Sequence, residues 1–250
     1  MLRKQSYEEH PPKAPKHPHS LHIHGQTLTD QWHWIKDKEN TSTLDYLSQE
    51  NNYTDLIMET TSAIQTLLYS EMRNRIKEDD SSVPQKQGPY FYHTKYQEGS
   101  EYPIHCRRHM DPGSSEEIIL DINELAIDKP YLRVGLVKIS PNHRLLAYST
   151  DESGSESFTI HIKDLTTGTL LSDEINGAYY SFEWANNSTT FFYTTLDINH
   201  RPIRARRHIL GNPPATDETI YEEKDSRFFV GVTKSATKRY IFVATQGNNM

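Results

Sequence analysis

The second half of the chain repeats one pattern at nearly regular intervals, and this repeat restricts the fold more than any other feature. A polar turn followed by an aromatic-bearing strand occurs in SPNHRLLAYSTD (140–151), ANNSTTFFYTTLD (185–197) and TKSATKRYIFVAT (233–245). Tyr148 and Tyr193 hold the same place in the pattern and are 45 residues apart. Periods of about 40–50 residues with several strands each are typical of β-propeller blades. A β-sandwich with irregularly spaced strands is the alternative that the pattern leaves open.

Strands are expected along the whole of residues 88–250, with no helix among them. The segments GPYFYHTKY and EYPIHCRR flank a short polar loop and predict a hairpin. Tyr92 lies 56 residues before the first tyrosine of the repeat, and Val243 lies 50 residues after the second. Roughly 160 residues at this period suffice for three blades and part of another. Because a propeller closes to hide its sheet edges, the ring in this chain is expected to be unfinished.

Residues 1–80 differ from the β-rich half in composition and pattern. The repeated prolines of PPKAPKHPH exclude a helix, so residues 1–25 predict an extended arm. Trp32 and Trp34 would lie on the same side of an extended segment and could dock together on an apolar surface.

Between about residues 43 and 77 the apolar period becomes helical. Ser42 and Asp45 have the spacing of a capping box, and two helices with a break near Asn51–Asn52 are predicted. Residues 78–88, rich in charge, Ser, Pro and Gly, predict a domain boundary. Apolar residues at helical spacing form a stripe of Ile57, Ile64, Leu68, Met72 and Ile76, which Leu44 and Leu47 extend toward the N-terminus.

The arm carries four histidines within nine residues, which raises the question of a metal site. His22 and His24 alternate as they would on one face of a strand. A stable zinc site needs three or four ligands with defined spacing and further supporting partners, and the arm offers neither. The segment therefore predicts a wrapping arm and not a metal centre. The histidines are His17, His19, His22 and His24.

Cys106 is the single cysteine of the chain, and it has His105 and His109 close to it in sequence. Adjacency in sequence does not give the geometry of a nucleophile and its base. A buried strand cysteine explains the residue better than a catalytic one. No G-x-S-x-G, P-loop or G-x-G-x-x-G motif occurs, and residues 153–157 (SGSES) predict a hairpin loop. No cofactor and no metal are expected.

Charge and hydropathy exclude several classes of partner. The formal net charge of −7 argues against general nucleic-acid binding. One basic segment, RPIRARRH (201–208), is expected to be a solvated strand or loop, with RNA binding as the alternative. No apolar run approaches the roughly 20 residues of a membrane span, and the N-terminus lacks the apolar region of a secretory signal. With one cysteine and no possible internal disulfide, a cytoplasmic location is expected.

Several segments of the chain occur in an order that, taken together, resembles that of a known protein family. The arm leads to His24-Gly25, then to D-x-W-x-W-x-x-D at residues 30–37, and then to the helices. Farther along come EEIILDINELA (116–126), FEWANNSTTFFYTTLD (182–197) and ETIYEEKDSRFFVGVTKSATKRYI (218–241). Together they resemble the prolyl oligopeptidase family of serine peptidases, specifically its oligopeptidase B branch, over about residues 10–250.

The resemblance implies an enzyme of two domains. An α/β-hydrolase domain would carry Ser, Asp and His, and a seven-bladed propeller would cover it and admit short peptides only. The arm and the helices would pack on the hydrolase domain. The reaction implied is hydrolysis of short peptides after Lys or Arg. Because the catalytic triad of the family follows the propeller, beyond Met250, no residue of this chain is expected to be catalytic.

Positions that match the family in this chain are expected to be structural. The predicted fold is mainly β with an N-terminal α-helical segment, about three blades of a seven-bladed propeller, and no α/β-hydrolase domain. Residues 1–80 form the arm and helices, and residues 81–250 form the first blades. The matching positions are His24, Gly25, Asp30, Trp34, Asp37, Leu120, Asp121, Asn123 and Trp184.

The function expected is that of the N-terminal and propeller part of an oligopeptidase B-like serine endopeptidase, inactive on its own. Its expected partners are short basic peptides, as substrates of the whole enzyme, and the missing hydrolase domain. Nucleic acid and membrane are not expected partners. The alternative is a non-catalytic propeller that binds a peptide or protein, for example by strand addition at an open sheet edge.

Overall fold

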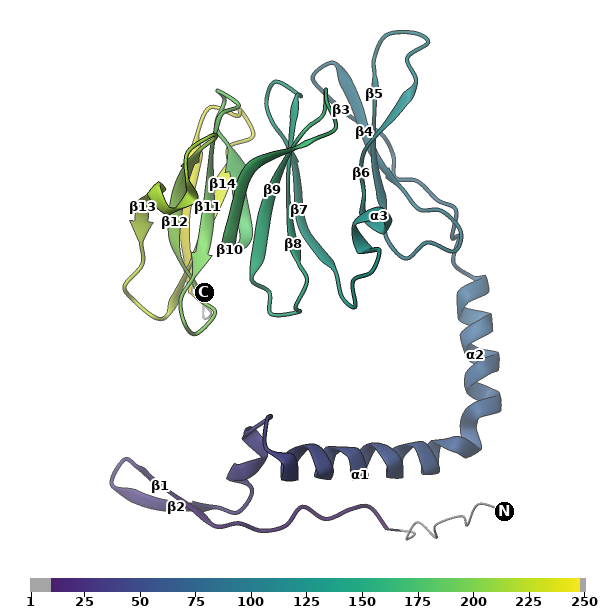
Figure 1. The fold of residues 1–250 in the computed structure, drawn as a ribbon, viewed down its shortest axis with the longest axis vertical. Helices are drawn as coiled ribbons and strands as arrows, with labels where there is room; N and C mark the ends of the chain where they lie inside the picture. Colours follow the sequence, from purple (N-terminus) through teal and green to yellow (C-terminus); the bar gives the residue numbers. More distant parts are fainter. Residues whose placement is uncertain (1–9, 248–250) are drawn as a thin grey trace. The chain divides into compact units, whose positions relative to one another are not determined.

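A computed structural model of the chain describes residues 10–247, which form two compact units divided between Lys77 and Glu78. The first unit holds a hairpin and two long helices, and the second holds the sheets (Figure 1). The part of the predicted arm in residues 1–9 lies outside the described residues. The roles expected of residues 1–80 and 81–250 stay predictions.

The described part of the arm contains a hairpin that the prolines do not reveal. Strands β1 (His19–Ile23) and β2 (Gln26–Asp30) pair antiparallel around a turn in which His24 has a φ of 52° and Gly25 a φ of 75°. Two successive positive φ values are typical of a tight two-residue hairpin turn. His24 therefore lies in the turn, and the prediction that it continues a strand face with His22 was wrong.

The two tryptophans do not share one side of an extended segment, as the sequence had predicted. Residues His33–Lys36 form a 3-10 helix, η1, which rotates Trp32 and Trp34 to different environments. Trp34 donates its indole N–H to the Pro15 carbonyl at 3.0 Å, whereas Trp32 is exposed. The local cause is Asp30, whose carboxylate accepts the backbone N–H of Trp32 at 2.9 Å and turns the chain.

The helical region has two long helices, but its start and its break differ from those predicted. Helix α1 (Thr41–Met58) begins after Asn40, whose side chain accepts the backbone N–H of Ser42, so the Ser42–Asp45 capping box was wrong. Helix α2 is Ser62–Asn74, and the break is the 3-10 helix η2 (Glu59–Thr61). In and next to η2, successive Thr and Ser hydroxyls bond to carbonyls three residues back, which competes with the helical ladder.

The first blade of the second unit is a four-stranded antiparallel sheet in chain order. The predicted hairpin is confirmed, with Tyr90 opposite His109 in the register. A short helix, α3 (Ile122–Ala126), follows the last strand, so the prediction of no helix after residue 88 was wrong. Asp121 causes it by accepting the backbone N–H of Asn123 at 2.9 Å. The strands are β3 (Gln85–Gln87), β4 (Tyr90–Lys95), β5 (Ile104–His109) and β6 (Glu116–Asp121).

The next two blades share one strand and so form a continuous seven-stranded sheet. The long strand β10 pairs with β9 in its first half and with β11 in its second half. Its register shifts on either side of Ala178, next to Gly177 with a φ of 72°. The strands are β7 (Arg133–Ile139), β8 (Leu145–Asp151), β9 (Phe158–Asp164), β10 (Leu170–Trp184), β11 (Thr190–Leu196), β12 (Pro202–Ile209) and β13 (Glu218–Glu222), with a 3-10 helix η3 (Pro214–Thr216) before β13.

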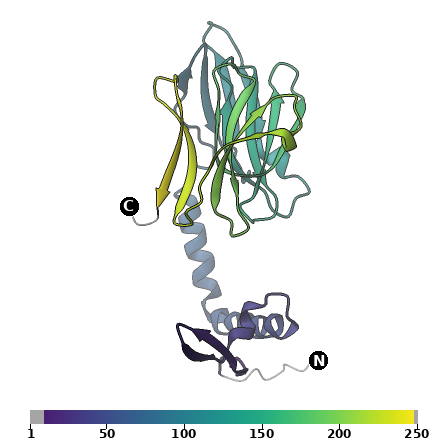
Figure 2. The same cartoon turned by 90° about the vertical axis from the view of Figure 1, so that its left-hand side faces the viewer.

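A further hairpin, β14 (Phe228–Lys234) and β15 (Ile241–Gly247), begins a fourth blade. Figure 2 shows this hairpin beside the preceding sheet, which β14 contacts through β10, β11 and β12. The sequence repeat is confirmed, because its reference residues lie on the second strand of each blade as described. Tyr92, Tyr148, Tyr193 and Val243 lie on β4, β8, β11 and β15, respectively. Three complete blades and part of another therefore occupy residues 85–247.

Each turn of the repeat has the same backbone geometry. His143, Ser188 and Lys238 all have a φ of 60°, and each donates its N–H to the carbonyl three residues earlier. The turn is then closed by a second backbone bond, such as Ser140 N–H to the Leu145 carbonyl at 2.9 Å. This geometry explains why the spacing of polar residues before each aromatic strand recurs.

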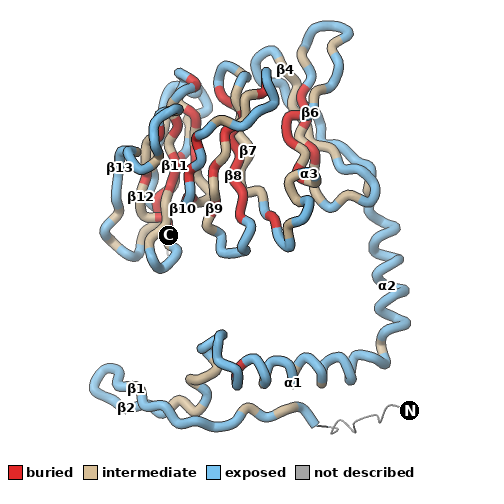
Figure 3. The backbone as a smooth tube through the Cα atoms, viewed as in Figure 1, coloured by how far each residue is buried: buried red, intermediate tan, exposed pale blue. Residues whose placement is uncertain are grey.

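The apolar core lies between neighbouring blades (Figure 3). Aromatic and β-branched residues of the second and third blades, among them Ile160, Phe182 and Trp184, are at most 2% exposed. Full burial of a large apolar side chain contributes about 1.5–3 kcal/mol. The helices of the first unit are exposed along most of their length (Figure 3). No helix within residues 10–247 is long and apolar enough to cross a lipid bilayer.

Candidate functional site

A cavity of about 690 Å³ is lined by residues from all four blades of the second unit. The ends of β7, β10 and β14 bring Lys138, Glu183 and Lys234 to its wall. The Lys138 ammonium pairs with the Glu183 carboxylate, and Lys234 donates to the carbonyl of Trp184 at 2.6 Å. Burial lowers the pKa of Lys234. These contacts tie three successive blades together at the cavity wall and leave charged groups facing its interior.

His143 closes the same cavity between the first two blades. Its Nδ1 lies 2.8 Å from the Tyr92 hydroxyl, and its carbonyl accepts from Arg107 at 2.6 Å. Burial lowers the pKa of His143, and the nearby cations Lys238 and Arg107 lower it further. The ring rests directly on Gly88, where a Cβ would come within 2.3 Å of its Nε2. Tyr92, Gly88 and His143 thus form one packed joint.

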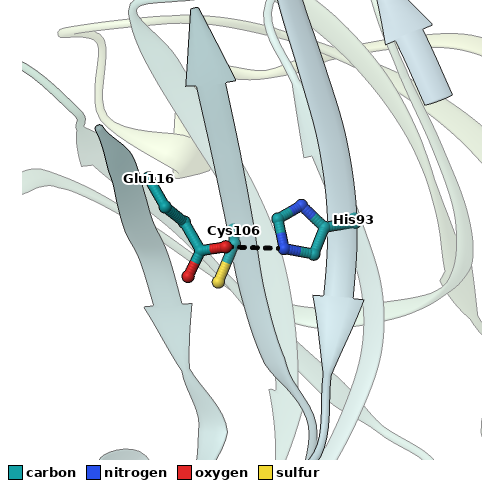
Figure 4. Close-up of side chains that lie close together, drawn as sticks. All are labelled: His93, Cys106 and Glu116. Carbon is teal, nitrogen blue, oxygen red and sulfur yellow. Dashed lines mark ion pairs between the residues drawn. The ribbon is translucent and has the colours of Figure 1, made fainter. Parts of the chain in front are cut away.

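Cys106 lies in a cluster that its sequence neighbours do not reveal (Figure 4). The sulfur is surrounded by His93 on β4 and Glu116 on β6, and the donor atoms of the three residues all lie within 4.8 Å of one another. Glu116 Oε2 is 2.9 Å from His93 Nε2, and Glu116 Oε1 is 2.6 Å from the Lys95 ammonium. Burial raises the pKa of the Cys106 thiol to about 11. Such a thiol is a poor nucleophile, as the sequence had indicated.

The two histidines nearest to Cys106 in sequence are not part of this cluster. His105 is the adjacent residue of the strand but is not one of the three residues whose donor atoms lie within 4.8 Å of one another, and His109 pairs with Asp111 at 3.0 Å. The true neighbour is His93, directly across the hairpin from Cys106 in the register. The signal was available in the hairpin prediction, which fixes which residues of the two strands face each other.

The histidines of the arm make separate contacts. His17 packs against Trp34 with ring centroids 5.5 Å apart, and His19 stacks on the ring of His33 at 3.8 Å. His22 Nδ1 lies 2.9 Å from the Thr27 hydroxyl. The structure therefore distributes them along the arm, in the packed and solvated positions that a wrapping arm implies. The predictions of no metal and no cofactor stay predictions.

The apolar stripe on the helices is exposed along its whole length. Its members are 46–68% exposed in the structure. An apolar face of this extent at helical spacing is the kind of surface that packs against another apolar surface. The exposed members on α1 and α2, and just beyond α2, are Leu44, Leu47, Ile57, Ile64, Leu68, Met72 and Ile76.

The basic segment at residues 201–208 is a strand, as one of the two predictions had it, because most of it belongs to β12. Its residues are buried or half-buried, so the prediction that the segment is solvated was wrong. Its arginines are paired within the sheet. Arg204 bonds to Glu222 at 2.9 Å, and Arg206 donates to the Asp217 carbonyl at 2.7 Å. Because carboxylates neutralise Arg201, Arg204 and Arg207, nothing in this row favours the RNA-binding alternative. The ion pairs of the row are completed by Arg201 with Asp197 and by Arg207 with Glu218.

The positions matched to the family on sequence have scaffold contacts. Asn123 bridges the backbone of Tyr102, accepting its N–H and donating to its carbonyl, both at 2.9 Å. Trp184 is buried and donates its indole N–H to the Lys138 carbonyl of the preceding blade at 3.1 Å. The prediction that the chain contains no catalytic residue stays a prediction.

Comparison of the sequence with curated proteins finds peptidases. The chain is 37% identical over 239 residues to Protease 2 of Moraxella lacunata, covering 93% of this chain and 35% of that protein. It is 34% identical to dipeptidyl aminopeptidase BI of Pseudoxanthomonas mexicana, covering 94% of this chain and 35% of that protein. The chain thus spans about a third of the length of these relatives.

Comparison with solved structures gives the same result for the fold. Oligopeptidase B from Leishmania major superposes with a TM-score of 0.88 at 29% identity, covering 96% of this chain and 36% of that chain. Oligopeptidase B from Trypanosoma brucei, with covalently bound antipain in a closed form, superposes at 0.86 and 28% identity, with shares of 95% and 36%. The family model of the prolyl oligopeptidase N-terminal β-propeller domain matches residues 12–249. The blades, the arm that precedes them and this match over nearly the whole chain lead to one conclusion: the chain belongs to the prolyl oligopeptidase N-terminal β-propeller family.

Proposed function

We propose that the chain is the N-terminal and propeller portion of an oligopeptidase B-like serine endopeptidase, which hydrolyses short peptides after Lys or Arg. The observation that carries the proposal is the family match over residues 12–249, together with the 35–36% share of the relatives that the chain covers. In this proposal the chemistry belongs to an α/β-hydrolase domain, where a His-activated Ser attacks and backbone donors stabilise the oxyanion. The chain supplies the cover and part of the support.

The exposed stripe on α1 and α2 is the surface that would contact the hydrolase domain. Its apolar side chains lie 46–68% exposed, and burying each against a partner would contribute part of the roughly 1.5–3 kcal/mol of full burial. The propeller blades would restrict access to peptides short and flexible enough to pass. The single cysteine, buried and free, supports a cytoplasmic location for the enzyme.

The first experiment measures hydrolysis of a fluorogenic arginyl-amide substrate. The chain alone should give no turnover above a mock purification. Addition of the separately produced hydrolase portion of Moraxella lacunata Protease 2 should restore turnover. The variant L68E/M72E, which places two charges on the stripe, should abolish restoration, whereas E71Q on the exposed surface of the same helix should not. Turnover that co-purifies with the chain alone would refute the assignment of chemistry to another domain.

A second, independent observation separates this proposal from a non-catalytic binding propeller. The nucleotide sequence following the codon for Met250 is read in the same frame. A continuing frame with a G-x-S-x-G motif supports the peptidase. A stop codon, combined with no restoration of turnover, would leave the binding module as the better account.

A further inference from the structure

Three neighbouring strands of the first blade present three different metal-binding side chains on one face. His93 on β4 and Cys106 on β5 are directly opposite each other in the register. Glu116 on β6 is two residues from Ile118, the partner of Cys106, and so points to the same side. Imidazole, thiol and carboxylate donors thus meet within 4.8 Å of one another (Figure 4).

The ion pair with Lys95 leaves one carboxylate oxygen directed at the cluster. Lys95 lies 2.6 Å from Glu116 Oε1, whereas Oε2 is the oxygen that lies 2.9 Å from His93 Nε2. A cation bound by Oε2 alone would therefore keep the lysine as a partner of the other oxygen. This arrangement also orients the carboxylate, which is the role that outer partners have in protein metal sites.

We propose that His93, Cys106 and Glu116 form a binding site for a thiophilic divalent cation, with Zn²⁺ as the ion of best fit. Mixed nitrogen, sulfur and oxygen donors suit Zn²⁺ better than Mg²⁺ or Ca²⁺, which take oxygen ligands. Zinc bonds of about 2.0–2.3 Å place tetrahedral ligands about 3.3–3.7 Å apart. The present separations, from 2.9 Å to at most 4.8 Å, reach that range by small side-chain rotations.

The site has an entry path and space for a fourth ligand. His93 and Cys106 both line the cavity of about 690 Å³, so a cation can reach the sulfur although the residue is buried. Cys106 would bind as the thiolate, and its proton would pass to solvent when the metal–sulfur bond forms. The sulfur has only a weak contact otherwise, 4.0 Å from the Ile104 carbonyl. Three protein ligands and a solvent molecule complete a tetrahedral site.

The test measures binding in a chain whose arm cannot compete for metal. The background is H17A/H19A/H22A/H24A, since any histidine-rich arm binds metal ions weakly. Titration with Zn²⁺ should show one site per chain. Titration with Co²⁺ should give a thiolate-to-metal charge-transfer band and the strong visible absorption of four-coordinate cobalt. Neither readout depends on peptidase activity, so the proposal stands or fails apart from the proposed function.

Matched substitutions then assign the ligands. C106A should remove the charge-transfer band and lower Zn²⁺ affinity by about 100-fold or more, and H93Q and E116Q should each lower it at least tenfold. H109A, on the same strand but paired with Asp111, should leave both readouts unchanged. Circular dichroism confirms folding, and H93Q with E116Q decides the test if C106A fails to fold. Zn²⁺ binding that persists in C106A or H93Q, a cobalt spectrum without the sulfur band, or no retained Zn²⁺ would each overturn the site.

Discussion

Replacing His208 by alanine should destabilise the second unit by several kcal/mol. The ring is fully buried on β12. Its Nδ1 lies 2.7 Å from Asp217 Oδ1 and its Nε2 lies 2.9 Å from Asp173 Oδ1. Each ring nitrogen therefore lies within hydrogen-bond distance of a buried carboxyl group, and the imidazole links the two carboxyl groups.

The expected loss of stability follows from the two buried carboxyl groups, Asp173 and Asp217, that the substitution leaves without the imidazole. The carboxylates keep their other donors, the Tyr193 hydroxyl at 2.8 Å from Asp217 and the Gly211 N–H at 2.6 Å from Asp173. They lose the buried imidazole that lies between them and contacts both. Removing one partner of a buried ion pair costs about 3–5 kcal/mol. An exposed pair such as Arg133 with Glu156 is screened by solvent and contributes little, so R133Q is the matched control.

Urea unfolding measures the difference in stability between H208A, R133Q and the unsubstituted chain. Trp184 becomes the single tryptophan in a W32F/W34F background, and its buried indole reports on the third blade. With a slope of about 2 kcal/mol/M, H208A should lower the midpoint by about 2 M, and R133Q by less than about 0.5 M. Adding D173N to H208A should recover stability, because it removes one uncompensated charge. A loss below about 1 kcal/mol in H208A, or a further loss on adding D173N, would refute the charge argument.

Three further predictions concern other parts of the chain. G88A should destabilise the joint between the first two blades, because Gly88 has a φ of 58° and the new methyl group would meet the His143 ring. Its thermal midpoint should be lower than that of G231A, whose new methyl group meets no atom within 4 Å, and equal midpoints would contradict the prediction. Cys106 should resist alkylation at pH 8 in the native chain and react in urea, because its pKa is raised from 9.0 to about 11. The stability due to the neutral buried thiol is present below pH 9 and falls as the pH rises toward 11. Rapid labelling of the native chain at pH 8 would contradict the raised pKa. The exposed stripe should cause concentration-dependent association in gel filtration that I64E or L68E reduces; a sharp monomeric peak for the unsubstituted chain would contradict this.

The blades could be predicted because each repeats a local rule. The turns before β8, β11 and β15 have the same positive φ and the same backbone bonds, so polar residues recur at positions such as His143 and Lys238. Long-range pairing could not be read in the same way. Strand β10 belongs to two blades, and the two halves are separated by a register shift near Gly177. The spacing of apolar residues does not predict where this shift occurs.

The misplaced details share a physical cause, which is competition between side chains and the backbone ladder. Residues Thr60 to Ser62 bond to carbonyls three residues back and interrupt the helix there, whereas Asn51–Asn52 remain helical.

The cluster of His93, Cys106 and Glu116 could not be found from neighbours along the chain, because its members meet across paired strands. His93 is 13 positions from Cys106 in the sequence but faces it directly in the register.

The strand that serves two blades sets the smallest piece of this architecture that can be exchanged. Strand pairing links β7 to β13 through β10, so residues 133–222 cannot be divided without separating strands that pair with each other. Loops, in contrast, join this block to the first blade and to the β14–β15 hairpin. A chimera with a relative should therefore be spliced at residues 127–132 or 223–227, and the two central blades should be inherited together.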